Sequence, residues 1–425
     1  MVKIRLRLGS FAAFLLMSCG SAAAECNRGL YRSGGQFVIL GAADRAKPAA
    51  GQRYAFLDGR RGSTADTNAL ARCVSDAAQV RQADGNWQTM SREATVEAHA
   101  TFTSDATKLS GELIEPAGPA DPARPLVVMV HGSEKATSPS LGYGYMLVAQ
   151  GVSVFVYDKR GTGASGGEYT QNFELLADDA AAALSEAQRL ARGRFGRSGY
   201  YGGSQGGWVA PLAATRSRAD FVAVGFGLVV SPIDEDLEQM LQEAEAQHLG
   251  AKEREEIRQL SSATATIVNS HFERGFDQLQ ALREHIGDEF WAKKIDGEYS
   301  GDMLRMADAD LRRIGRARFD DVGLIWGYDA KTALARLKVP LLWVLAGEDR
   351  EAPIEVTERT LRQLRDSGQE IDIYLFPHTD HGIMEFRTNP DGTRTTTRIA
   401  QGYLRLLGDW IKGTLHPPYG KAQKL

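Results

Sequence analysis

The sequence predicts an α/β fold in which helices cover both faces of a mostly parallel sheet. From about residue 96 onward, short apolar runs typical of buried strands alternate with helical patterns, which is the order that parallel strands and crossover helices produce. The 425 residues, 43% of them hydrophobic and 24% charged, suffice for two or three globular units. The 45 glycines against 14 prolines suit many tight turns between strands and helices.

The elements of this main domain follow from the apolar runs. A hairpin is predicted over residues 96–114, because the residues alternate on both sides of a short polar turn. Runs of apolar and β-branched residues predict the strands, and Ala-rich or amphipathic stretches predict the helices. The expected strands lie at 126–130, 152–157, 199–201, 221–230, 340–346 and 371–376, and the expected helices at 173–192 and 399–411.

Residues 233–331 interrupt this alternation. They are charged and mainly helical in pattern, with amphipathic stretches at 234–249 and 252–274. Such a length is too great for a loop in a compact domain. We therefore expect a helical lid inserted between two strands, near the carboxyl end of the sheet. The main domain would then comprise residues 96–232 and 332–425.

Residues 1–24 are predicted to be a secretory signal peptide. The segment holds three cations, a short apolar stretch and a run of alanines that forms a cleavage site: Lys3, Arg5, Arg7, residues 11–17 and 22–24. Losing three cations and no acids takes the formal net charge from -4 to -7. The mature protein would be acidic and periplasmic or secreted. One alternative is a loose lipobox with a lipid anchor on Cys19, and another is a buried first helix.

Residues 25–95 form a Gly-rich segment with short β-like runs, for which we expect the role of a structural cap. Two cysteines remain after signal cleavage, Cys26 and Cys73. An even pair in an oxidising compartment predicts one disulfide. Two free buried thiols are the alternative.

A serine in a Gly-rich turn is the sharpest motif. Residues 202–206 read Gly-Gly-Ser-Gln-Gly, which is the G-x-S-x-G pattern of a nucleophile on a tight turn between a strand and a helix. The hydroxyl of Ser204 needs a base to take its proton, and the base needs an acid to orient it. His381 and Asp349 each follow a predicted strand, at the edge of the sheet where open α/β folds place their sites.

The three residues occur along the chain in the order Ser204, Asp349, His381, which is the order of the α/β-hydrolase superfamily. The chain resembles this superfamily over residues 96–415, and most closely its serine esterase and serine peptidase branches. His-Gly-Ser at 131–133 resembles the oxyanion loop, and residues 158–165 resemble the D-x-R-G-x-G-x-S turn. The resemblance implies an α/β-hydrolase fold.

The resemblance also implies an oxyanion hole. Its donors would be the backbone N–H groups of Gln205 and Ser133, with Gly132 as an alternative to Ser133.

Two neighbours compete for roles in the triad. His378 competes with His381, which is favoured because a glycine follows it, as is common in the family. Glu348 competes with Asp349, which is favoured because a proline four residues on matches the family's D-x-x-x-P spacing.

The resulting prediction is a serine hydrolase that cleaves carboxylic esters of small molecules through an acyl-enzyme intermediate. A serine peptidase or amidase of the same fold is the nearest alternative, followed by thioester cleavage and by a catalytically silent binding protein. The lid acids could bind a peptide amino group or form a solvated helix face: Glu235, Asp236, Glu238, Glu243 and Glu245.

No cofactor, metal or nucleic-acid partner is expected. The sequence holds neither a Walker-type phosphate loop nor a dinucleotide fingerprint, and its histidines lack metal-ligand spacing. The formal net charge of -4 offers no field for a polyanion. No transmembrane segment is expected after signal cleavage.

Overall fold

The computed structural model describes residues 26–42, 47–75, 77–135, 137, 142–320 and 322–425. The predicted signal peptide, its cleavage site and Cys19 lie outside these residues. Within the described ranges, no helix is both long enough and apolar enough to cross a membrane.

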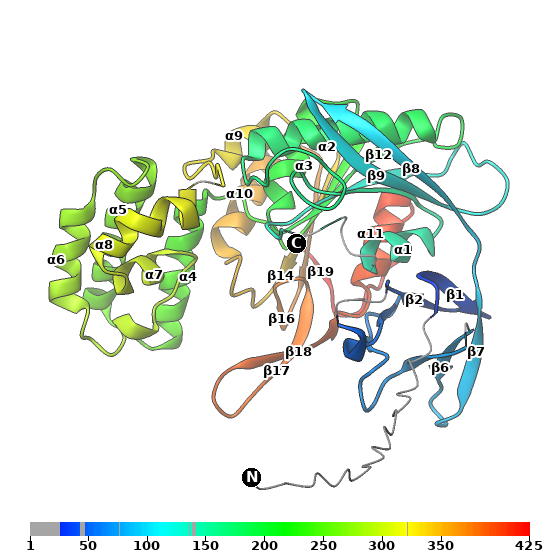
Figure 1. The fold of residues 1–425 in the computed structure, drawn as a ribbon, viewed down its shortest axis with the longest axis horizontal. Coiled ribbons are helices and arrows are strands. Elements are labelled where there is room, and N and C mark those ends of the chain that lie inside the picture. The colour runs from blue at the N-terminus through cyan, green and yellow to red at the C-terminus, as the bar shows by residue number, and fades with distance from the viewer. Residues whose placement is uncertain (1–25, 43–46, 76, 136, 138–141, 321) are drawn as a thin grey trace, which may run out of the picture.

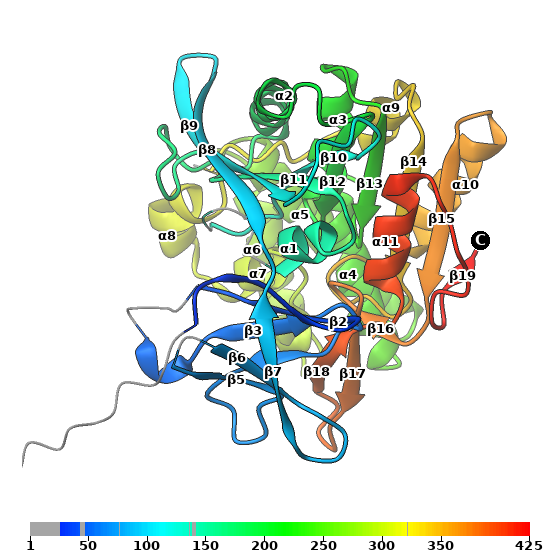
Figure 2. The same ribbon diagram turned by 90° about the vertical axis from the view of Figure 1, so that its right-hand side faces the viewer.

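A nine-stranded sheet forms the centre of the molecule, in the order β19-β15-β14-β13-β12-β10-β11-β9-β8 (Figures 1 and 2). Six neighbouring strands pair in parallel: β10 (Leu126–Val130), β11 (Ser153–Tyr157), β12 (Ser198–Gly203), β13 (Phe221–Gly225), β14 (Leu341–Ala346) and β15 (Ile371–Phe376). Antiparallel strands close the edges: β8 (Thr95–Ser104) and β9 (Thr107–Pro116) on one side and β19 (Gln423–Lys424) on the other. The predicted mostly parallel α/β fold is confirmed.

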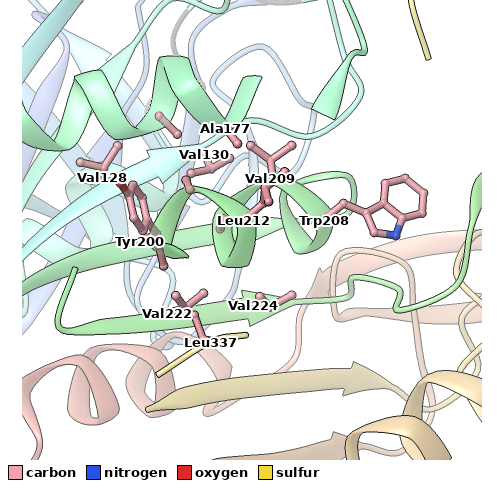
Figure 3. Packing of buried hydrophobic residues seen from close by; sticks show 14 of the residues in the cluster. Val128, Val130, Ala177, Tyr200, Trp208, Val209, Leu212, Val222, Val224 and Leu337 are labelled. Carbon is pink, nitrogen blue, oxygen red and sulfur yellow. The ribbon is translucent and has the colours of Figure 1, made fainter. Parts of the chain in front are cut away.

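Helices cover both faces of this sheet, because its central strands are apolar on both sides. In β10, Leu126, Val128 and Val130 face one core and Val127 and Met129 face the other. The first core is covered by α2 (Phe173–Leu190), α3 (Gly206–Thr215), α9 (Ala330–Ala335) and α10 (Glu355–Asp366), and the second by α1 (Gly142–Val148) and α11 (Tyr403–Lys412). Figure 3 shows the first core, where side chains of β10, β12 and β13 pack against α2 and α3.

Two details differ from the elements expected from the sequence. The strand expected at 221–230 ends at Gly225, because Phe226 turns the chain with a φ of 45°. The helix expected from 399 begins at Tyr403, and the residues before it belong to a small sheet of β16 (Thr379–Asp380), β17 (Met384–Thr388) and β18 (Arg394–Ile399). These strands are largely polar, so their apolar pattern is weak.

The chain between β13 and β14 is helical and gathers to one side of the sheet (Figure 1). Besides α9, which packs on the central sheet, it comprises α4 (Pro232–Ala246), α5 (Ala251–Asn269), α6 (Phe276–Ile286), η2 (Ala292–Lys294), α7 (Ser300–Arg305), α8 (Asp308–Asp310) and the π-helical η3 (Leu311–Asp320). These helices share an apolar core of their own, which includes Met240, Ile257 and Leu279. The boundaries of a lid domain at residues 233 and 331 stay a proposal, which this separate core supports.

The N-terminal segment forms a seven-stranded antiparallel sheet, in the order β4-β3-β2-β1-β7-β6-β5. Its strands are β1 (Gly29–Ser33), β2 (Gln36–Leu40), β3 (Arg53–Phe56), β4 (Arg61–Ser63), β5 (Ala71–Val74), β6 (Ala77–Arg81) and β7 (Trp87–Arg92), with a short turn of helix η1 (Pro48–Ala50). The long strand β8 leads from this sheet to the central one (Figure 2). A disulfide joins Cys26 to Cys73, as the pair of cysteines predicts.

Removing this disulfide is expected to lower the melting temperature. The bond closes a loop with a sequence separation of 47 residues, and the chain-entropy model assigns such a loop about 4 kcal/mol of stabilisation. Calorimetry of a Cys26→Ser, Cys73→Ser double variant tests this, with reduced wild-type protein as the matched control. Equal melting temperatures for the oxidised wild type and the double variant would contradict the prediction.

Candidate active site

Ser204 lies on the sharp turn between β12 and α3. Its φ is 53°, a left-handed value that is unusual for a residue with a side chain. The turn depends on the glycines around it. A Cβ atom on Gly202 would lie 2.4 Å from the carbonyl oxygen of Gly206, and one on Gly203 would lie 2.5 Å from the ring of Phe226. Small residues at these positions therefore let the backbone pass closely enough to present the hydroxyl.

Asp349 and His381 meet at the carboxyl ends of β14 and β15. His381 Nδ1 lies 3.1 Å from both carboxylate oxygens of Asp349. Asp349 is only 1% exposed, and its Oδ1 also accepts the backbone N–H groups of Glu351 at 3.0 Å and Ala352 at 2.8 Å. The carboxylate is thus held in one orientation by its own loop, facing the imidazole.

The environment of His381 shifts its basicity. Burial lowers the pKa of His381, whereas the hydrogen bond and charge of Asp349, with further contributions from Glu351 and Asp380, raise it. The net result is a pKa above the ordinary 6.5. The ring of Phe226 packs edge-to-face on the imidazole at 4.9 Å between centroids, which restricts its rotation.

His378 and Glu348, the alternatives to His381 and Asp349, lie apart from this site. His378 Nδ1 is 2.8 Å from Glu348 Oε1, and the two side chains are 79% and 38% exposed. Glu348 also pairs with Arg394 at 2.7 Å. Neither His378 nor Glu348 lines the cavity described next, so the geometry favours His381 and Asp349.

A cavity of about 240 Å³ opens between the sheet and the helical insertion. Ser204 and His381 both line it, together with Gln205 and Ser133, the two residues expected to supply oxyanion donors. Gln205 is buried at the start of α3, with 2% of its surface exposed. Ser133 follows β10 on an exposed loop, and its carbonyl oxygen accepts the hydroxyl of Tyr169 at 2.5 Å. The structure therefore brings these four predicted residues to one cavity.

Three carboxylates give this cavity an acidic wall. Glu235 comes from α4, Glu298 from the chain before α7, and Glu351 from the loop that carries Asp349. Burial, together with the charges of the neighbouring carboxylates, raises the pKa of Glu235 well above its ordinary range. Arg318 is the only Arg or Lys among the described residues that line the cavity. In the described part of the chain, no group of His, Cys, Asp and Glu side chains is arranged to hold a metal ion.

Of this wall, the sequence indicated only Glu235, as one of many lid acids. Glu351 could have been noticed as an acid two residues after Asp349. Glu298 and Arg318 carry no sequence signal, because they reach the cavity only through the packing of the insertion.

Comparison with known proteins places the chain in a family. The model of the serine aminopeptidase family S33 matches residues 121–385, which is more than half of the sequence. The chain belongs to this family of α/β-fold serine hydrolases. The match covers β10 to β15, the insertion between them, and Ser204, Asp349 and His381. The resemblance inferred from the motifs is therefore confirmed.

Similar solved structures come from several organisms. The Pyrococcus furiosus esterase Pf2001 is 14% identical over 68% of this chain and 84% of its own, with a TM-score of 0.42. The Pyrococcus horikoshii acylaminoacyl peptidase is 16% identical over 83% of this chain and 47% of its own, with a TM-score of 0.42. Est1E of Butyrivibrio proteoclasticus, solved with ferulic acid, is 17% identical over 74% of this chain and 96% of its own, with a TM-score of 0.41. Similarity at this level carries no argument about the substrate. No curated protein matches this sequence.

Proposed function

We propose that this protein hydrolyses carboxylic esters through an acyl-enzyme intermediate, with Ser204 as nucleophile, His381 as base and Asp349 as the acid that orients it. One observation supports this most strongly. Ser204, on its sharp turn, lines the same cavity as His381. The Nδ1 atom of His381 lies 3.1 Å from the buried carboxylate of Asp349. A serine is activated when such an imidazole takes its proton, and a shared cavity is the placement that this step requires.

The reaction would proceed in two halves. His381 takes the proton of Ser204 as the hydroxyl oxygen attacks the ester carbonyl, and the negative oxygen that forms is held by the backbone N–H groups of Gln205 and Ser133. The C–O bond to the alcohol then breaks, and His381 protonates the departing alkoxide. Water repeats the cycle on the acyl-enzyme, releasing the carboxylic acid and restoring the Ser204 hydroxyl.

The test is turnover of p-nitrophenyl esters of increasing acyl length, with an aminoacyl anilide and a fluorophosphonate label run in parallel. Ester turnover together with labelling of Ser204 is the expected result, and the optimal acyl length would define the depth of the cavity. Turnover of the anilide in preference to every ester would favour the peptidase. Absence of both turnover and labelling would overturn the proposal in favour of a binding protein.

The acidic wall favours a second candidate, hydrolysis of an aminoacyl or peptidyl substrate. Even without Glu235, whose raised pKa favours its neutral form, Glu298 and Glu351 outnumber Arg318, the one Arg or Lys among the described residues that line the cavity. Such a wall attracts a positively charged amino group and repels a free carboxylate. The same triad serves both reactions, so the charge of the substrate rather than the nucleophile distinguishes the candidates.

Glu298→Gln tests this second candidate. Removing the charge is expected to lower kcat/KM for a cationic aminoacyl anilide roughly two- to fivefold, or about 0.4 to 1 kcal/mol, because solvent screens the exposed carboxylate of Glu298. Turnover of a neutral ester should change little. Glu245→Gln, on α4 but outside the cavity, is the matched control. An equal effect on both substrates would exclude charge recognition by Glu298.

We further propose that the mature protein is periplasmic or secreted. The signal-peptide pattern of residues 1–24 and the disulfide between Cys26 and Cys73 support this location, because disulfides persist in oxidising compartments. N-terminal sequencing of the exported protein should begin at Glu25. A start at Cys19 would instead favour the lipid anchor.

A further inference from the structure

A buried lysine lies behind the active-site cavity. Lys159 follows β11 and is only 1% exposed. Its ammonium group donates to the carbonyl oxygen of Gly132 at 2.9 Å and to the side-chain oxygen of Gln205 at 3.0 Å. Lys159 thus connects the loop after β10 to the turn that begins α3.

Both contacts involve the proposed oxyanion donors. The carbonyl of Gly132 and the N–H of Ser133 belong to one peptide unit, and in a trans peptide they point in opposite directions. Holding the Gly132 oxygen therefore fixes the direction of the Ser133 N–H. The second contact restrains the side chain of Gln205, whose own backbone N–H is the other proposed donor.

Residues that follow Lys159 in the chain also hold the next peptide unit, whose carbonyl belongs to Ser133. The Tyr169 hydroxyl donates to the carbonyl oxygen of Ser133 at 2.5 Å, and Gln171 Nε2 donates to it at 3.4 Å. The ammonium of Lys159 lies 5.1 Å from the centre of the Tyr169 ring, within cation–π range. The chain after β11 therefore restrains two successive carbonyls of the loop.

Stability alone does not account for this lysine. Among the described residues, Lys159 forms no salt bridge within 4.0 Å, and its ammonium bonds to neutral oxygens. Burying a charge without a carboxylate partner costs stability that an apolar residue would not. Burial lowers the pKa of Lys159 to about 8, although the charge of Glu134 opposes this.

We propose that Lys159 is a positioning residue that holds the Ser133 and Gln205 N–H groups in the geometry of an oxyanion hole. Lys159 does not line the cavity, so it acts through these two residues and does not contact the substrate. The role rests on the proposed serine hydrolase function.

The test compares Lys159→Met with wild-type protein, using the best ester found and a trifluoromethyl ketone of the same acyl group. The ketone adds to a serine as a tetrahedral alkoxide, so it reports on the oxyanion hole. Because loss of an oxyanion donor costs about 10² to 10³ in kcat, misplacement is expected to cost roughly 10- to 100-fold. Affinity for the ketone should fall by the same factor, while KM changes by less than about threefold.

Lys135→Met is the matched control. Lys135 is exposed and also lies over the Tyr169 ring, at 5.4 Å, but no hydrogen bond from it to Gly132 or Gln205 is present. We expect wild-type kcat and ketone affinity from this variant. An equal loss in both variants would show a general effect of positive charge near the cavity and would overturn the positioning role.

The remaining outcomes separate the two proposals. If melting shows that Lys159→Met does not fold, Lys159→Gln, which keeps a buried N–H donor, takes its place, with an intermediate loss of kcat expected. Unchanged kcat and ketone affinity in a folded variant would overturn the role of Lys159 alone. A wild-type protein that cleaves no acyl substrate and is not labelled would overturn the hydrolase function first, and this role with it.

Discussion

Replacing Ser204 by alanine is expected to lower kcat for the best ester by roughly 10⁴- to 10⁶-fold. The loss is this large because no covalent acyl-enzyme can form without the hydroxyl. The fold should survive, since Ser204 already occupies its left-handed conformation with a Cβ atom and alanine only removes the oxygen. The measurement is turnover of p-nitrophenyl ester together with fluorophosphonate labelling.

Ser185→Ala is the matched control for this change. Ser185 lies on α2, and within the described residues its hydroxyl donates to the carbonyl oxygen of Ala181. Its removal should leave kcat and labelling unchanged. Retained ester turnover in Ser204→Ala, after contaminating esterases have been excluded, would contradict the assignment of the nucleophile.

Replacing Asp349 by asparagine is expected to lower kcat by about 10⁴-fold, by stabilising the wrong tautomer of His381. The loop determines how the amide would sit. Oδ1 accepts the N–H groups of Glu351 and Ala352, so the oxygen of an asparagine would stay there. Its NH₂ group would then take the place of Oδ2 and donate to His381 Nδ1. The proton of a neutral His381 would move to Nε2, which could no longer accept one from Ser204.

The pH profile gives this variant a second readout. A base acts only when neutral, so kcat/KM falls as the pH drops through the pKa of His381. In the wild type this limb should lie above pH 6.5, because Asp349 and the other acids outweigh the effect of burial. Without the charge of Asp349 the pKa of His381 falls, and the limb of the residual activity should move to lower pH.

Glu348→Gln is the control that separates the two candidate acids. Glu348 is 38% exposed and contacts His378 and Arg394, outside the cavity. Its neutralisation should leave kcat and the pH limb close to those of the wild type. If Glu348→Gln were the damaging substitution and Asp349→Asn were not, the assignment of the acid would have to be reversed.

The sequence by itself determined the α/β fold and the position of the proposed nucleophile, because both are local signals. Buried parallel strands are short, nearly continuous apolar runs, and β10, β14 and β15 each appear in the sequence in this form. The turn at Ser204 needs small residues at fixed spacings, so the glycines at 202 and 206 mark it directly. The family resemblance followed from the order of these motifs.

The sequence favoured His381 over His378 and Asp349 over Glu348 only by the spacing of a glycine and a proline, whereas the tertiary structure adds the contacts and burial that support this choice. A shift of one to three residues along a loop turns a side chain from the cavity to the solvent. The positions of the acidic wall and of Lys159 are likewise determined by tertiary packing. Glu298 and Arg318 line the cavity and Lys159 contacts Gly132 and Gln205 across long separations in sequence, and no local periodicity predicts which residues packing will bring together.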